Sequence, residues 1–143
     1  MIYLDYSATT PVLESVLDSY IKVTRDFIGN ANSIHTLGVK SKELMMKATK
    51  QISECLNCSF REIIYTSGAS ESNSTAILGV ARKYSNRGKH IITSKLEHKS
   101  VLETMSYLES IGYEISYCPL NKDGSLNMNE LEKLIREDTI LFS

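Results

Sequence analysis

Residues 62–71 read EIIYTSGASE, a short β-rich run that leads into a turn rich in glycine and hydroxyl groups. The run from Glu62 to Thr66 predicts a strand, and the turn opens a helix. The same order repeats along the chain, with strands predicted at His90–Ser94, Tyr113–Tyr117 and Thr139–Phe142. The helices between them carry apolar stripes at Ile77, Val80, Ala81 and Tyr84, at Val101, Met105 and Leu108, and at Met128, Leu131 and Ile135. This alternation predicts an α/β fold in three layers, a mainly parallel sheet with helices on its faces.

Two helices are expected before this alternation. Thr10 is a good N-cap residue and Pro11 suits a first turn, so a first helix should begin there. Its apolar stripe is Val12, Val16, Tyr20 and Val23. The stretch from Phe27 to Gly38 has loop chemistry, and a second helix should run from Val39 to near Asn57. That helix carries Leu44, Ala48, Ile52 and Cys55 on one face.

Composition indicates one soluble domain over residues 1–143. The chain has 16 basic and 17 acidic residues and is 42% hydrophobic, which is enough apolar material for a core without disulfides or a structural metal. A net charge of −1 argues against binding to nucleic acid or to an acidic membrane surface. No secretory signal or membrane span is recognisable, and three cysteines without an export signal favour reduced thiols in the cytoplasm.

Two segments are candidates for chemistry, each with a plainer alternative. The turn from Thr66 to Glu71 joins a predicted strand to a helix N-terminus, an arrangement that binds phosphate through free backbone N–H groups. From spacing alone, the favoured alternative is an ordinary capped loop with Ser70 as N-cap. His98 follows the next strand, on the rim where parallel sheets bind ligands. A histidine there can stack on a flat cofactor or move a proton, or it can have no catalytic role.

Three further patterns are interpreted as structural. Cys55 and Cys58 lie at a predicted helix end rather than the N-terminus typical of reactive pairs, so they are expected to be structural and partly buried, with no metal bound. The segment from Asn121 to Asn127, followed by Glu130, imitates a calcium loop, but the first ligand position of such a loop would be Pro119, whose side chain cannot bind the ion. Asp123-Gly124 is therefore expected to form a turn, and Asn127 with Glu130 a helix cap. Four lysines are expected to form a solvated face of the second helix, namely Lys40, Lys42, Lys47 and Lys50.

In this order, these motifs resemble the opening of cysteine desulfurases of the NifS/IscS type. Those enzymes are class V, fold-type I pyridoxal-phosphate enzymes. The resemblance rests on Tyr3-Leu4-Asp5 with Ala8-Thr9-Thr10-Pro11, on Gly29-Asn30 with Ser33-Ile34-His35 and Gly38, on residues 62–71 with Asn73, and on Glu97-His98 with Val101. It covers essentially the whole chain.

The resemblance implies pyridoxal 5′-phosphate as cofactor and assigns three residues to it. Ala69 and Ser70 match the phosphate-binding turn, with Ser70 where the family usually has threonine. His98 matches the histidine that stacks on the pyridine ring and assists proton transfer. The loop from Gly29 to His35 matches a loop near the active-site mouth and is given no role.

Three functional residues of the family have no counterpart in the sequence. They are the lysine in a Ser-x-His-Lys context, the aspartate that pairs with the pyridine nitrogen, and the cysteine that forms the persulfide. Cys55, Cys58 and Cys118 precede those motifs and match none of them. The chain therefore resembles the N-terminal part of a longer enzyme and ends inside a predicted strand. Residues 1–143 are expected to comprise the N-terminal segment and the first part of the large, cofactor-binding domain, without a second complete domain, and to be inactive alone.

The activity implied for the parent enzyme is conversion of L-cysteine to L-alanine. Sulfur would pass as an enzyme persulfide to an acceptor protein, for iron–sulfur cluster assembly or tRNA thiolation, and the parent would be a homodimer. The alternatives are another class V enzyme, such as a selenocysteine lyase or an aminotransferase, and a non-catalytic fragment that binds phosphate or assists assembly.

Overall fold

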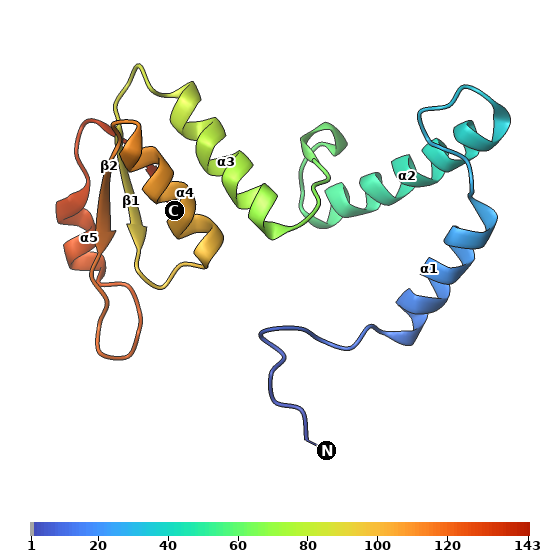
Figure 1. Ribbon diagram of the computed structural model, residues 1–143, viewed down its shortest axis with the longest axis horizontal. Coiled ribbons are helices and arrows are strands. Elements are labelled where there is room, and N and C mark those ends of the chain that lie inside the picture. The colour runs from blue at the N-terminus through green and yellow to red at the C-terminus, as the bar shows by residue number, and fades with distance from the viewer. Residues whose placement is uncertain (1) are drawn as a thin grey trace. The chain divides into compact units, whose positions relative to one another are not determined.

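The computed structural model describes residues 2–143, which form two compact units that divide after Ile64. The first unit contains helices α1 (Glu14–Asp26) and α2 (Thr36–Cys55) and the short 3-10 helix η1 (Phe60–Glu62) (Figure 1). The second contains a sheet with helices α3, α4 and α5.

Both long helices of the first unit begin at residues that differ from the prediction. Helix α1 begins at Glu14 with Leu13 as N-cap, not at Thr10. Val12 is 61% exposed, so no burial stabilises an additional N-terminal turn. Helix α2 begins at Thr36, three residues before Val39, because the side chain of His35 accepts a hydrogen bond from the Gly38 N–H and caps the helix. Histidine is not a preferred cap, so the sequence carried no signal for it.

The predicted end of α2 near Asn57 is confirmed. Asn57 has φ 51°, and the N–H groups of Asn57 and Cys58 donate to the carbonyls of Glu54 and Ser53 at 3.2 and 3.0 Å. These two hydrogen bonds, together with the left-handed conformation of Asn57, form a Schellman motif at the end of the helix. The four lysines of the solvated face are exposed as expected.

The cysteine pair at this helix end is not buried, contrary to the sequence-based expectation. Cys55 and Cys58 are both exposed, whereas Cys118 in the other unit is buried. Ala48 and Ile52, on the same predicted apolar face, are exposed as well. Within residues 2–64, α2 packs against η1, and this short element does not cover that face.

The second unit is a three-stranded parallel sheet in the order β2-β1-β3. Its strands are β1 (His90–Ser94), β2 (Glu114–Cys118) and β3 (Thr139–Phe142), and its helices are α3 (Ala69–Lys83), α4 (Lys99–Ser110) and α5 (Met128–Leu134). The alternation of strand and helix from residue 69 onward, and the parallel pairing it predicted, are confirmed.

The strand predicted over Glu62–Thr66 is absent from the described residues. Glu62 ends η1, and residues 63–66 carry no strand assignment. Ser59 caps η1, since its side chain accepts from the Arg61 N–H while the Glu62 carboxylate accepts from the Ser59 N–H. A β-rich run becomes a strand only beside another strand, and among the described residues 62–66 take part in no strand pairing.

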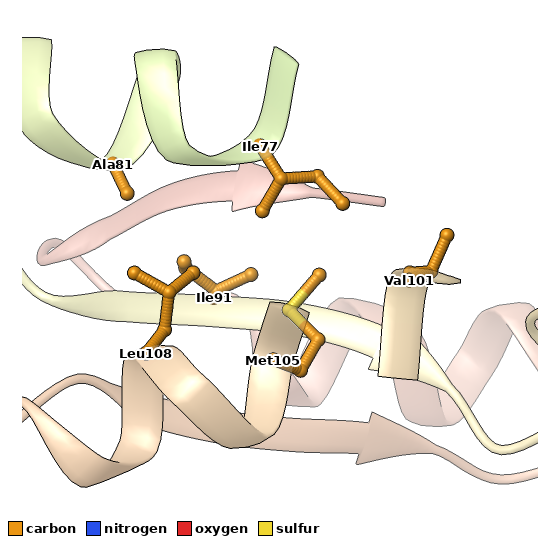
Figure 2. Packing of buried hydrophobic residues seen from close by; sticks show 6 residues of the cluster. All are labelled: Ile77, Ala81, Ile91, Val101, Met105 and Leu108. Carbon is orange, nitrogen blue, oxygen red and sulfur yellow. The ribbon is translucent and has the colours of Figure 1, made fainter. Parts of the chain in front are cut away.

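Helices cover both faces of the sheet. Ile91 is fully buried and packs with Ile77 and Ala81 of α3 and with the apolar residues of α4, Val101, Met105 and Leu108 (Figure 2). Ile92, the next residue of β1, points to the opposite face and packs with Cys118 and with Leu131 of α5. The sheet is therefore the middle of three layers, as the alternation predicted.

The connection into α5 is as expected. Gly124 has φ 85° in a turn braced by Asp123, whose carboxylate accepts a hydrogen bond from the Ser125 N–H. The Asn127 side chain caps α5 by accepting a hydrogen bond from the Glu130 N–H.

Residues 2–143 contain no group of three or more metal-binding side chains placed to hold an ion. They also contain no helix that is both long and apolar enough to cross a bilayer.

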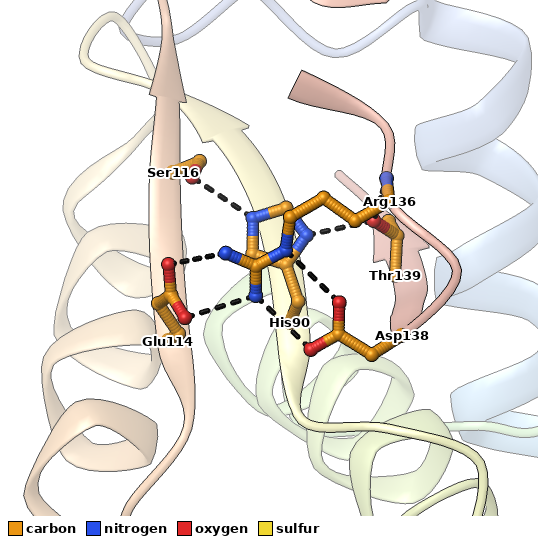
Figure 3. Close-up of polar contacts among 6 residues, drawn as sticks. All are labelled: His90, Glu114, Ser116, Arg136, Asp138 and Thr139. Atoms are coloured by element: carbon orange, nitrogen blue, oxygen red, sulfur yellow. Dashed lines mark hydrogen bonds and ion pairs between the residues drawn. The ribbon is translucent and has the colours of Figure 1, made fainter. Parts of the chain in front are cut away.

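A buried histidine joins the three strands at one end of the sheet (Figure 3). His90 is 0% exposed, and its Nδ1 and Nε2 lie 2.7 Å from Thr139 Oγ1 and 2.8 Å from Ser116 Oγ. Beside it, the Arg136 guanidinium bonds to the carboxylates of Glu114 and Asp138, with Nη2–Oε2 and Nε–Oδ1 distances of 2.9 Å. The network ties the start of β1 to both of its neighbours.

This network is expected to make the sheet less stable in mild acid. Burial lowers the pKa of His90 below its ordinary value of 6.5, and the nearby Arg136 charge lowers it further. The unfolded chain then binds more protons than the folded chain, so the free energy of unfolding should decrease as pH falls through about 6.5. The expected result is that His90→Gln removes this slope in denaturant titrations.

A second decrease in the free energy of unfolding, expected at lower pH in both the wild type and His90→Gln, serves as the internal control. Hydrogen bonds from Arg136 lower the pKa values of Glu114 and Asp138 below their ordinary 4.5 and 3.8, so both proteins should lose further stability below about pH 4.5. Parallel curves for the wild type and His90→Gln between pH 7 and 5 would rule out His90 as the titrating group.

Candidate active site

The turn before α3 is braced by its own side chains. Glu71 Oε2 accepts hydrogen bonds from Ser67 N at 2.6 Å and from Ser67 Oγ at 2.7 Å. The hydroxyl oxygens of Thr66 and Ser72 lie 2.6 Å apart. Gly68 is the N-cap residue of α3, so Ser70 lies within the first turn and is not the cap that the plainer interpretation assigned to it. Its side chain is exposed and free of the capping role.

Glu71 changes what this turn offers to an anion. The backbone and side-chain hydrogen bonds from Ser67 lower the pKa of the Glu71 carboxyl group, which is therefore ionised at neutral pH. The Ser67 N–H, one of the expected phosphate-binding groups, is already taken by that carboxylate. An anion is left with the N–H groups of the first turn of α3 and the Ser70 hydroxyl, close to a negative charge.

His98 is the N-cap residue of α4. Its Nδ1 accepts a hydrogen bond from the Ser100 N–H at 3.2 Å and lies 2.9 Å from Ser100 Oγ. The turn between β1 and α4 is held by Ser94, whose hydroxyl donates to Glu97 and accepts from the Leu96 N–H. The side chain of His98 is exposed on the carboxyl-end side of β1, where the sequence predicted it.

Two hydrogen bonds between α3 and α4 bring the predicted site residues together. Asn73 Nδ2 donates to Ser100 Oγ at 2.9 Å, and one turn further along, the hydroxyl oxygens of Ser74 and Thr104 lie 3.2 Å apart. Between the two helices is a cleft of about 520 Å³, within the range of small-molecule sites. Both Ser70 and His98 line it. The other lining residues are Ser74, Leu78, Lys99, Ser100, Glu103, Thr104 and Tyr107.

The sequence-based reasoning gave no role to Ser74, Ser100 or Thr104. Their spacing was a usable signal, because Ser70 and Ser74 on α3, and Ser100 and Thr104 on α4, are each four residues apart and so share a helix face. The structure shows that these two faces meet.

The residues present fit a small phosphorylated aromatic cofactor. The first turn of α3, with Ala69 and Ser70, supplies N–H groups and a hydroxyl for an anion, and His98 supplies a flat ring on the same cleft. The charge of Glu71 opposes an anion at the first turn of α3. A second carboxylate, Glu103, lines the cleft, and its Oε1 lies 3.3 Å from Lys99 Nζ.

Neutralising Glu71 should therefore strengthen anion binding. Glu71→Gln keeps an acceptor for the Ser67 N–H but removes a negative charge from the first turn, so inorganic phosphate should bind about 2- to 5-fold more tightly. Amide chemical-shift titration of the chain measures this affinity. Glu62→Gln is the matched control, since Glu62 makes the equivalent bond to Ser59 N at η1. Equal affinity in all three proteins would place the anion elsewhere.

Comparison with known proteins agrees with this geometry. The family model described as aminotransferase class-V matches residues 2–143. The chain belongs to the class V aminotransferase family. A curated relative from Dictyoglomus turgidum, named cysteine desulfurase IscS, is 43% identical over 142 residues, 99% of this chain and 36% of the relative. The chain thus spans about a third of the length of such relatives.

Solved structures of the family share the fold. One described as a NifS-like protein is 41% identical and has a TM-score of 0.89, with 94% of this chain and 37% of that chain covered. Another, described as SspA in complex with cysteine, is 38% identical with a TM-score of 0.88 and covers 98% of this chain and 40% of that one. The fold is therefore part of the fold-type I architecture that the sequence resemblance implied.

Proposed function

We propose that this chain is the cofactor-binding N-terminal part of a pyridoxal-phosphate-dependent cysteine desulfurase. The observation that carries the proposal is that Ser70 and His98, 28 positions apart in the sequence, line one cleft between α3 and α4. The names of the relatives support cysteine desulfuration within the class V family, and one solved relative is described with cysteine bound.

In the proposed reaction, L-cysteine yields L-alanine and its sulfur passes to an acceptor protein. When bound, pyridoxal phosphate supplies the electron sink for breaking bonds at the substrate's α and β carbons. The residues of this chain would do the binding and positioning. Ala69 and Ser70 would hold the phosphate through first-turn N–H groups and the Ser70 hydroxyl, and His98 would lie against the ring and exchange a proton. A homodimeric, cytoplasmic parent enzyme is part of the same proposal.

Cofactor titration of the chain tests the binding role. Adding pyridoxal phosphate should move the amide signals of Gly68 to Glu71 and the ring signals of His98. Ser70→Ala should weaken binding about tenfold, because a hydrogen bond to a charged group is lost. Ser125→Ala is the matched control, since Ser125 lies in the turn before α5. Shifts confined to residues outside the α3–α4 cleft would refute the cofactor assignment.

A further inference from the structure

Hydrogen bonds link three side chains in a row from α3 to α4, and His98 is the last of them. Asn73 Nδ2 lies 2.9 Å from Ser100 Oγ, and Ser100 Oγ lies 2.9 Å from His98 Nδ1. Ser100 is 9% exposed, so its hydroxyl has little access to water and depends on these two partners. The backbone N–H of Ser100 also points at His98 Nδ1, at 3.2 Å.

The backbone N–H of Ser100 determines which group donates in each of these hydrogen bonds. An amide N–H can only donate, so His98 Nδ1 must be the acceptor and carries no proton in the neutral ring. The Ser100 hydroxyl, at hydrogen-bond distance from the same nitrogen, must then donate to it. Its oxygen is left to accept, and the Asn73 amide N–H₂ is the group that donates to it. Neutral His98 therefore holds its proton on Nε2.

We propose that Asn73 and Ser100 are positioning residues that hold neutral His98 in the Nε2–H tautomer. In this form His98 can donate a hydrogen bond from Nε2 and cannot accept one there. If the proposed function is correct, this makes neutral His98 a hydrogen-bond donor to the bound cofactor or substrate. The tautomer itself depends only on the contacts between α3 and α4.

The two side chains should have different effects on the tautomer. Ser100→Ala removes the shorter of the two hydrogen bonds to Nδ1 and leaves the backbone N–H, so the ratio of Nε2–H to Nδ1–H forms should decrease about 2- to 10-fold. Asn73→Asp should decrease it further. A carboxylate at position 73 accepts a hydrogen bond from the Ser100 hydroxyl. The serine oxygen then presents a lone pair to Nδ1, which favours a proton on that nitrogen.

The test is to measure the ¹⁵N chemical shifts of the His98 ring in the cofactor-free chain at about pH 8, where an ordinary imidazole is neutral. We expect a pyridine-type shift at Nδ1 and a pyrrole-type shift at Nε2 in the wild type, with both shifts moving toward the average in the two variants. Ser106→Ala is the matched control, since Ser106 is an exposed serine of the same helix and should leave the ratio unchanged.

Two results would overturn the proposal. One is a proton on Nδ1 in the wild-type chain, which needs no variant to be observed. The other is a wild-type tautomer ratio in both Ser100→Ala and Asn73→Asp. The tautomer is measured without cofactor, so a failure of the proposed function gives a different result from a failure of this proposal. In that case the Nε2–H tautomer is intact, but the chain binds no pyridoxal phosphate.

Discussion

Replacing Ile91 with alanine is expected to lower the free energy of unfolding of the 65–143 unit by about 2–5 kcal/mol. Ile91 is 0% exposed and lies in the middle strand, where it contacts the apolar residues of both α3 and α4 (Figure 2). Truncation of Ile91 removes buried methyl groups and leaves a cavity between α3, α4 and the sheet, which the surrounding residues fill only in part by relaxing. The same contacts hold α3 against α4, so the cleft lined by Ser70 and His98 should open as well.

Hydrogen exchange of the β1 amides measures this effect within the second unit. Ile34→Ala is the matched control, because Ile34 is 99% exposed and the same truncation there should change stability by less than about 0.5 kcal/mol. Equal protection of β1 in Ile91→Ala and the wild type would contradict the layer assignment of this strand.

The parts of the fold that were predictable are those that local sequence determines. Strands β1 and β3 have the predicted bounds, and β2 is shifted by one residue, because each is a compact β-rich run between turn residues. Helix α5 begins after Asn127, where the Asn127–Glu130 cap predicted it. These signals lie within a few residues of the elements they specify.

The errors have a different cause. Residues 62–66 have strand-like composition, but a strand requires a neighbouring strand, and among the described residues this run pairs with none. The apolar face of α2 was predicted from its spacing, yet burial depends on what packs against it, and Ala48 and Ile52 are exposed. Spacing indicates which face is apolar and does not show what covers it.

The candidate site divides in the same way. Ser70 and His98 could be singled out from a turn and a motif because each lies next to a strand or helix boundary. The Asn73–Ser100 and Ser74–Thr104 hydrogen bonds could not, since they depend on how α3 packs against α4. The hydrogen bonds between Ser67 and Glu71 are local, since the two residues are four positions apart, but the prediction of a phosphate-binding turn treated the Ser67 N–H as free.

The 143-residue chain alone is expected to show no turnover of L-cysteine, a complete loss relative to a full-length member of the family. Its sequence has no Ser-x-His-Lys segment, so no lysine stands in the context that holds the cofactor covalently in the enzymes it resembles. It also has no cysteine suited to take up sulfur at the site. Cys118 is buried in β2, and Cys55 and Cys58, exposed beside the C-terminal end of α2, match no persulfide-forming cysteine of the family that the chain resembles.

The measurement is release of alanine and sulfide from L-cysteine in the presence of pyridoxal phosphate, with a full-length relative as positive control and the cofactor without protein as background. The expected result is background release, while the amide shifts of Gly68 to Glu71 still report cofactor binding. Binding without turnover follows from the physical difference between the two tasks. An anion site at a helix N-terminus is local to one turn, whereas covalent catalysis requires a nucleophile and a base placed against the reacting atoms. Release of more than one equivalent of alanine per chain would show that these residues contain a complete active site.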